Sequence, residues 1–334
     1  MLKYELASLN GFNATIAFSA SEDIGFATGD KNNHNNELSS SRGSYSKLTE
    51  SYINYVNGGL NIKMGRQPLD TPLADSDDIR MIQNTFESYL LRYQFSNFEI
   101  LALNIKSWQG FDADLDKGWV DLGSKGMTVT AVIYSDLFDF RAWHYDINIP
   151  GEETRAIYLD AGCSINIGEN KNIHLLGQFL DEKEKNNSVI SARIYGFHNE
   201  FVINNLGFNI AYNHSEKIKG KRSFSGIGGG NMFTSMDKLI IDDIADDREV
   251  NAVVVGMTYR YDNFSFLYAY GNFKGKENSF GIKEHIVEQN IKLGYSIDEK
   301  FEAVGVYAMQ RDKENSTKTL YDWNRVQISI KYNF

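Results

Sequence analysis

Hydrophobic and polar residues alternate along much of this chain, and the alternation is clearest at its end, in residues 320–334. One face of this stretch carries apolar side chains: Val326, Ile328, Ile330, Tyr332 and Phe334. The residues between them are polar: Arg325, Gln327, Ser329, Lys331 and Asn333. A period of two predicts a strand with one apolar and one polar face. A barrel in a lipid bilayer needs such strands, because its outer face meets lipid and its lumen meets water.

The same alternation recurs along the chain and predicts an all-β protein of about 17 strands. Residues 60–64, 208–213 and 264–271 show it most plainly. The predicted strands are 1–8, 11–20, 47–56, 59–66, 86–94, 98–107, 126–134, 138–146, 155–167, 173–180, 189–203, 207–214, 249–261, 264–273, 284–295, 301–310 and the final stretch. We therefore expect residues 1–334 to form a single domain, a transmembrane antiparallel β-barrel.

The connections between these strands support a membrane barrel over a soluble sheet. About eight short turns alternate with eight longer connections, as in outer-membrane barrels with short periplasmic turns and long extracellular loops. All three prolines fall in the longer connections, where no sheet hydrogen bond is lost. Aromatic residues gather beside the short turns, where a girdle at the membrane interface is expected. A soluble array of β-repeats explains neither the sorting of the connections nor the amphipathic final strand.

The predicted strand number is odd, whereas bacterial outer-membrane barrels have an even number. The final strand ends on the short-turn side, so the first predicted strand starts on the long-connection side. We therefore expect that a signal peptide and one N-terminal strand of an 18-stranded parent are missing.

Composition argues against several other classes of protein. The net charge of -10 argues against a nucleic-acid partner. No apolar run is long enough for a transmembrane helix. The mean hydropathy of -0.39 suggests a soluble protein, but polar lumen residues produce the same average in a barrel. Cys163 is the one cysteine, so no internal disulfide and no cysteine metal cluster can form.

No pattern in the sequence predicts a cofactor, a metal site or a catalytic centre. The six histidines lack metal-ligand spacing, and His214 and Ser215 point to opposite faces of one strand. The acidic run 237–247 lacks the spacing of a calcium loop, so we expect a solvated extracellular loop there. Glycine-rich residues 226–230 are expected to make that connection flexible.

The connection 67–85 carries several charged residues and two of the three prolines. Its charged residues, with one just before it, are Arg66, Asp70, Asp75, Asp77, Asp78 and Arg80. A barrel of 16 to 18 strands leaves an aqueous channel, whose selectivity an inward-folded loop can set. We predict that residues 67–85 form this constriction. The alternative is an ordinary solvated surface loop.

This region resembles the OprD-type outer-membrane porins. The likeness is most specific over GRQPLDTPLADSDDIR at 65–80, continuing to Asn84-Thr85-Phe86. Shorter similarities lie at 2–5, 50–55 and 142–146, while Gln83 stands where that family has a proline. The resemblance implies an 18-stranded pore, often a trimer, that passes small carboxylate-bearing solutes and amino acids.

The resemblance also implies a line of inward basic side chains opposite the acidic constriction loop. The alternation of faces places several basic residues inward: Lys63, Arg92, Arg141, Arg260, Lys292, Arg325 and Lys331. Such a row offers many weak sites for an anion, as conduction requires. The alternative for each residue is a solvated lumen side chain paired with a nearby carboxylate.

Together these patterns predict a cofactor-free porin of the Gram-negative outer membrane that lets small hydrophilic solutes, such as carboxylates or amino acids, diffuse through water. Its expected partners are outer-membrane lipid, those solutes and further copies in a homotrimer. A second hypothesis is a structural or adhesive barrel acting through extracellular loops such as 21–46 and 215–248. A third hypothesis, an outer-membrane enzyme, is disfavoured because no catalytic constellation is present.

Overall fold

The computed structural model describes residues 1–22, 44–76, 82–229, 232–298, 300–314 and 322–332. Seventeen strands of this part of the chain form one antiparallel sheet, in which each strand pairs with its neighbours in sequence. They are β1 (Leu2–Glu5), β2 (Phe12–Ser21), β3 (Tyr45–Asn57), β4 (Leu60–Gln67), β7 (Thr85–Phe95), β8 (Phe98–Gln109), β10 (Met127–Ser135), β11 (Asp139–Ile147), β12 (Thr154–Gly168), β13 (Lys171–Glu184), β14 (Ala192–Ile203), β15 (Leu206–Ser215), β16 (Val250–Tyr261), β17 (Phe264–Gly275), β18 (Glu284–Ser296), β19 (Phe301–Asp312) and β20 (Trp323–Tyr332).

Three shorter strands and one helical turn lie in the long connections. The strands β5 (Asp70–Thr71) and β6 (Ala74–Asp75) pair with each other as a small hairpin. The strand β9 (Val120–Asp121) pairs with β8, and the 3-10 turn η1 (Ile241–Asp243) precedes β16. No helix in the described residues is long and apolar enough to cross a membrane.

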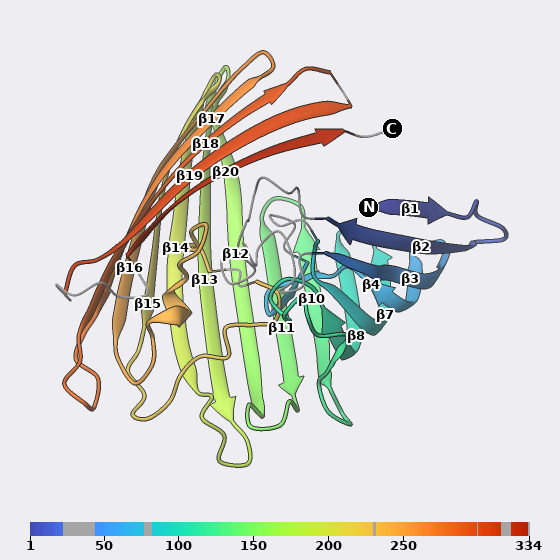
Figure 1. Cartoon of the computed structure of the whole chain (residues 1–334), viewed down its shortest axis with the longest axis horizontal. Coiled ribbons are helices and arrows are strands. Elements are labelled where there is room, and N and C mark those ends of the chain that lie inside the picture. Colours follow the sequence, from blue (N-terminus) through green and yellow to red (C-terminus); the bar gives the residue numbers. More distant parts are fainter. Residues whose placement is uncertain (23–43, 77–81, 230–231, 299, 315–321, 333–334) are drawn as a thin grey trace.

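The sheet curves into a wall whose two edges are β1 and β20 (Figure 1). In this view the short turn between β16 and β17 lies at the top and the one between β1 and β2 at the right, whereas the longer connection between β13 and β14 lies at the bottom. The predicted strand number and the alternation of short and long connections are therefore confirmed. Strand bounds differ by a few residues. The strand predicted for residues 189–203 begins at Ala192 in the structure. The backbone of Val189 and Ser191 instead forms hydrogen bonds with Arg222 of a long connection.

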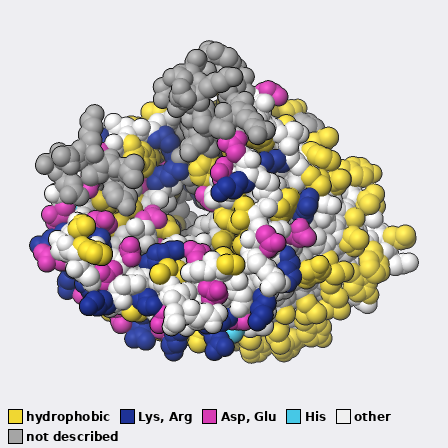
Figure 2. All heavy atoms as spheres, turned by 60° about the horizontal axis from the view of Figure 1, so that its bottom comes forward, with side chains coloured by type: hydrophobic (Ala, Val, Ile, Leu, Met, Phe, Trp, Pro, Cys, Tyr) yellow, Lys and Arg dark blue, Asp and Glu magenta, His cyan; other side chains and the backbone are white. Residues whose placement is uncertain are grey.

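Alternating side chains give the wall an apolar outer face. On β20 the side chains of Val326, Ile328 and Ile330 are 71%, 77% and 66% exposed. The other strands repeat this with exposed apolar side chains such as Leu91 and Ile210. In Figure 2, which looks toward the long connections, charged side chains of both signs spread over that end while hydrophobic side chains cover the flank. A large exposed apolar flank is unfavourable in water and is typical of a surface that contacts lipid.

The apolar core lies on the inner side of the wall, where long connections fold against it. Strand residues such as Leu101, Tyr145 and Ile194 are fully buried there. Residues of two connections complete the same cluster: Leu69, Leu73, Ala74, Phe224, Ile227, Met232, Leu239, Ile241, Ile244 and Ala245. The long connections 68–84 and 216–249 are thus anchored inside the wall by apolar burial.

The acidic run 237–247 is therefore not the solvated extracellular loop expected from the sequence. Ile241 and Ile244 within it are 0% and 1% exposed, and they pack into the core cluster. The apolar residues between the acids explain the difference, since burying one isoleucine contributes about 1.5–3 kcal/mol.

The assignment of faces can be tested on β20. Ile328→Arg puts a charge on the outer face, and the matched control Ser329→Arg puts it on the inner face. Arginine on a lipid-facing site at mid-depth costs about 2–4 kcal/mol. We expect Ile328→Arg to lower the free energy of unfolding in lipid vesicles by about that amount, and the control to lower it by much less. Chemical denaturation in vesicles measures both; equal losses would contradict the assignment.

Candidate pore constriction

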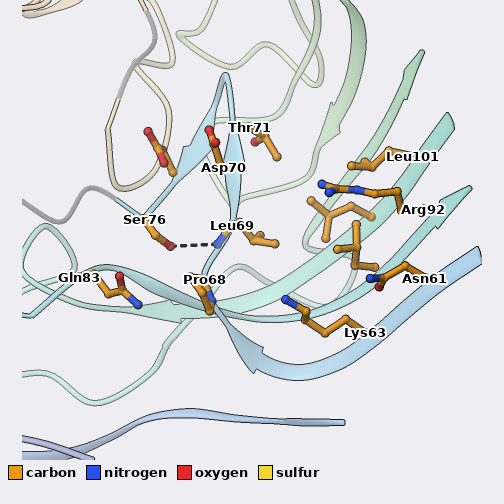
Figure 3. A pocket seen from close by; sticks show the side chains of 13 residues that line it. Asn61, Lys63, Pro68, Leu69, Asp70, Thr71, Ser76, Gln83, Arg92 and Leu101 are labelled. Carbon is orange, nitrogen blue, oxygen red and sulfur yellow. Dashed lines mark hydrogen bonds between the residues drawn. The ribbon is translucent and has the colours of Figure 1, made fainter. Parts of the chain in front are cut away.

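The hairpin β5–β6 follows directly from the local sequence. Asp70 pairs with Asp75 and Thr71 with Ala74, so Pro72 and Leu73 form the turn. Proline pre-sets the backbone angle that the first central position of such a turn requires. The Thr71 hydroxyl donates to Ala74 O (2.9 Å), and Leu69 N donates to Ser76 Oγ (2.9 Å; Figure 3). The tip is a rigid unit that places Asp70 at a fixed position.

Contacts from two other parts of the chain hold the hairpin against the inner face. Leu73 N donates to the hydroxyl of Tyr145 on β11 (3.3 Å). Ile227 exchanges backbone hydrogen bonds with Leu73 O (3.0 Å) and Asp75 N (3.1 Å). Leu69 and Leu73 are buried, and each contributes about 1.5–3 kcal/mol, against about 0.5–1.5 kcal/mol for one hydrogen bond. Apolar burial fixes the depth of the hairpin, and the hydrogen bonds fix its orientation.

The glycine-rich stretch 226–229 lies directly against the hairpin, in place of the flexible connection expected from the sequence. The Cβ of any other residue at Gly228 would lie 2.3 Å from Asp75 O, and its backbone has a positive φ of 80°. Both features restrict the position to glycine. Here glycine permits close approach of two backbones.

Asn84 joins three long connections behind the hairpin. Its side-chain amide donates to Asp112 Oδ2 (2.7 Å) and to Gly228 O (3.1 Å). Asn84 and Gly228 are buried, so no water replaces the bond to Gly228 O if it is lost, whereas Asp112 is exposed. The sequence motif Asn84-Thr85-Phe86 thus has a structural role: it locks the connections 68–84, 110–126 and 216–249 together.

A cavity of about 390 Å³ separates the hairpin from the wall formed by β4, β7 and β8. Lys63 and Arg92 extend into it from the wall, and Asp70 and Asp75 line it from the hairpin (Figure 3). A second cavity of about 740 Å³ includes Asp70 and Arg92 again, and continues to Arg141 on β11. Asp70 and Arg92 therefore border both spaces.

The basic residues of this wall are partly neutralised by carboxylates. Arg92 Nε lies 3.1 Å from Glu99 Oε1, and Arg141 Nε lies 2.6 Å from Asp160 Oδ1. Lys63 Nζ lies 4.7 Å from the centre of the Tyr52 ring, a distance at which a cation is attracted to the ring face. These contacts orient the cations while leaving them at the edge of the cavities. A hydrated anion can then meet several weak positive sites in succession.

The other predicted site residues that the structure describes are not gathered at these cavities. Arg66 does not line either one; its Nε lies 3.7 Å from Glu87 and its guanidinium stacks 4.5 Å from the Trp119 ring. Arg260, Lys292 and Lys331 lie on β16, β18 and β20, in another sector of the wall. The remaining predicted residues, Asp77, Asp78 and Arg80, are outside the described residues.

Arg325 on β20 has a different role from the one predicted. It forms an ion pair with Asp237, which belongs to the connection 216–249, and both side chains are largely buried. Nearby, Glu288 accepts the backbone N–H groups of Lys238 (3.1 Å) and Leu239 (3.0 Å). Wall residues of this sector therefore bind the connection. The apolar residues inside the acidic run, Leu239 to Ile244, are the sequence signal that could have revealed this docking.

Two carboxylates of this connection have pKa values shifted in opposite directions. Burial raises the pKa of Asp242 to about 7. Hydrogen bonds from Ser279 and from Gly220 N hold the pKa of Asp247 at about 2. Asp247 thus remains charged at any physiological pH and links two connections, with Oδ1 2.8 Å from Gly220 N and Oδ2 2.9 Å from Ser279 N. In the described residues no group of three or more His, Cys, Asp or Glu side chains could hold a metal ion.

The arrangement of strands matches solved structures of outer-membrane porins. Pseudomonas aeruginosa OpdK, solved with vanillate, has a TM-score of 0.78 and 14% identity over 99% of this chain and 90% of its own. P. aeruginosa OccK9 (OpdG) has a TM-score of 0.79 and 10% identity, covering 96% and 85% of the two chains. Acinetobacter baumannii OccAB4 has a TM-score of 0.78 and 13% identity, covering 96% and 83%.

At these identities the likeness establishes the fold. The sequence matches no protein-family model and no curated protein. The resemblance to OprD-type porins expected from residues 65–86 is confirmed at the level of the barrel architecture.

The role of Asn84 in holding the three connections together can be tested by truncating its side chain. Asn84→Ala removes two hydrogen bonds and leaves the buried Gly228 O unpaired, which costs about 1–3 kcal/mol. We expect faster hydrogen exchange in residues 68–76 and a lower free energy of unfolding. Asn97→Ala is the control, because it removes an amide–aspartate bond of 2.8 Å at an exposed turn. If both variants exchange like the parent protein in residues 68–76, Asn84 does not hold the hairpin.

Proposed function

We propose that this protein is a porin of the Gram-negative outer membrane, through which small hydrophilic solutes diffuse passively. The observation that carries this proposal is the hairpin β5–β6, which reaches into the lumen and places Asp70 opposite Lys63 and Arg92 with a cavity between them. A lumen narrowed by charged groups, without a closed binding pocket, suits diffusion of hydrated solutes.

The fold and the outer surface support a location in the outer membrane. The strands turn apolar side chains outward, and proteins of the same fold include an outer-membrane protein of P. aeruginosa. The expected surroundings are therefore lipid on the outside and water within. Assembly into a homotrimer, which the resemblance to OprD-type porins implies, remains a prediction.

Small carboxylates and amino acids are the solutes we propose. The basic side chains of Lys63, Arg92 and Arg141 follow one wall past the hairpin and provide attraction for a carboxylate. The acidic Asp70 and Asp75 face them and provide attraction for an ammonium group or repulsion for excess anions. One protein of similar fold, OpdK, was solved with vanillate, which is a carboxylate.

A structural or adhesive role is less well supported by the described connections. Adhesion needs loops that project from the cell surface, whereas the loop 215–248 packs apolar side chains of its described residues into the inner core cluster. In the other loop named for this role, 21–46, residues 23–43 lie outside the described residues. Proteins of this fold with known structures are channels, which likewise favours transport over enzymatic chemistry.

Planar-bilayer recording tests the proposal. We expect the purified protein to form ohmic channels in potassium chloride. Asp70→Asn with Asp75→Asn should raise the anion-to-cation permeability ratio, because a charge about 4 Å from an ion contributes about 1 kcal/mol even in water, roughly a fivefold effect. Lys63→Gln with Arg92→Gln should lower the ratio. Reversal potentials in a salt gradient measure both shifts.

A surface aspartate provides the matched control for this series. Asp136 accepts a bond from Asn97 at an exposed short turn, so Asp136→Asn changes the net charge by the same amount as Asp70→Asn away from the hairpin. Its reversal potential should equal that of the parent protein. Absence of channels would refute the porin proposal, and channels with unchanged reversal potentials in both double variants would refute this placement of the constriction.

A further inference from the structure

Two buried carboxyl groups meet where the connection 216–249 touches the wall. Glu182 on β13 and Asp242 in η1 are 1% and 6% exposed. Ser223, also fully buried, lies beside both carboxyl groups. The three side chains join the wall to both described parts of the inner segment, which we define as residues 222–229 and 232–245.

The hydroxyl of Ser223 cannot compensate both carboxyl groups if they are ionised, because it has one proton and can donate it to one acceptor. One oxygen of each carboxyl group, Glu182 Oε1 and Asp242 Oδ1, is buried and has no hydrogen-bond partner. An ionised pair would therefore be both unpaired and mutually repulsive.

The surrounding charged groups are engaged elsewhere. Arg222 of the inner segment pairs with Glu152, and Lys221 pairs with Glu184 of β13. Asp243, the neighbour of Asp242 in η1, is exposed and accepts a bond from Ile240 N (3.0 Å), so it adds negative charge. Burying an uncompensated charge costs several kcal/mol, and a carboxyl group avoids this cost by taking up a proton.

We propose that Glu182, Ser223 and Asp242 form a buried proton-binding site that fastens the inner segment to the lumen wall. A protonated pair is neutral, lets one carboxyl group donate a hydrogen bond, and keeps the segment seated. Loss of the proton on Asp242 leaves an anion in an apolar setting and drives Asp242 toward water. Because Ile227 of the same segment is bonded to the hairpin, unseating also loosens the constriction.

The direction of the pH dependence follows from the pKa of Asp242. Burial raises it to about 7 in the seated form, whereas a solvated aspartate has a pKa near 3.9. Between about pH 4 and 7 the unseated form has lost its proton and the seated form has kept it. The seated-to-unseated ratio therefore falls by up to about tenfold per pH unit in this window. Above about pH 7 both forms are ionised and the ratio levels off.

Hydrogen exchange on the whole protein in lipid nanodiscs tests the site without reference to transport. Phe224 N donates to Glu182 Oε2 (3.0 Å), so its protection reports seating. After correction for intrinsic exchange rates, we expect the protection of residues 222–229 to fall steeply from pH 5 to pH 7.5. Asp242→Asn, which cannot ionise, should keep high protection at pH 7.5. Asp243→Asn, the exposed neighbour, should follow the parent profile.

Single-channel recording provides a second measurement, which depends on the proposed porin function. Conductance should rise with pH in the parent protein and in Asp243→Asn, and should stay at its low-pH value in Asp242→Asn. Hydrogen exchange with the expected pH dependence, in a protein that forms no channel, would support the proton-binding site and refute the porin proposal.

Three results would overturn the proton-binding site. Protection that does not vary with pH would show that the pair does not titrate in this range. Loss of protection in Asp242→Asn at pH 5 would show that the carboxylate charge is required. Full protection at pH 7.5 that appears only with added calcium would show that a metal ion, in place of the proton, neutralises the pair.

Discussion

The alternation of side chains between two faces of each strand is the constraint on which this structure depends. It keeps apolar residues such as Ile328 outside and turns Lys63 and Arg92 inward, while the ladder between strands satisfies the backbone. A shift of one residue in any strand would exchange the two sets. The charge of the lumen and the apolar outer surface are thus consequences of the same register.

The lumen is narrowed by connections that the wall itself binds. Apolar burial supplies most of the free energy, through residues such as Leu73 and Ile241. Polar wall residues then fix the register of each connection, as Glu288 does with two consecutive backbone N–H groups. Asn84 joins the hairpin to the neighbouring connections. The proposed constriction is therefore a cooperative assembly of three connections, in which the hairpin provides the charge.

The sequence was sufficient for properties that depend on a local period. It predicted the strand number and the inward position of Arg92, because both follow from the alternation of side chains. It was not sufficient for contacts between distant segments. The ion pair of Arg325 with Asp237 joins residues 88 positions apart, and no local pattern encodes it. The burial of Ile241 was not predicted, because the acidic residues around it in the sequence are typical of a solvated loop.

Chemical block of the channel at Asp70 tests the central claim most directly. Asp70 is exposed and borders both cavities, and Cys163 can be replaced by serine so that one introduced cysteine remains. Asp70→Cys should conduct until a bulky, membrane-impermeant thiol reagent is added, and the current should then fall in single-channel steps. A current that stays unchanged after complete labelling, verified by mass, would contradict a pore that passes between this hairpin and the basic wall.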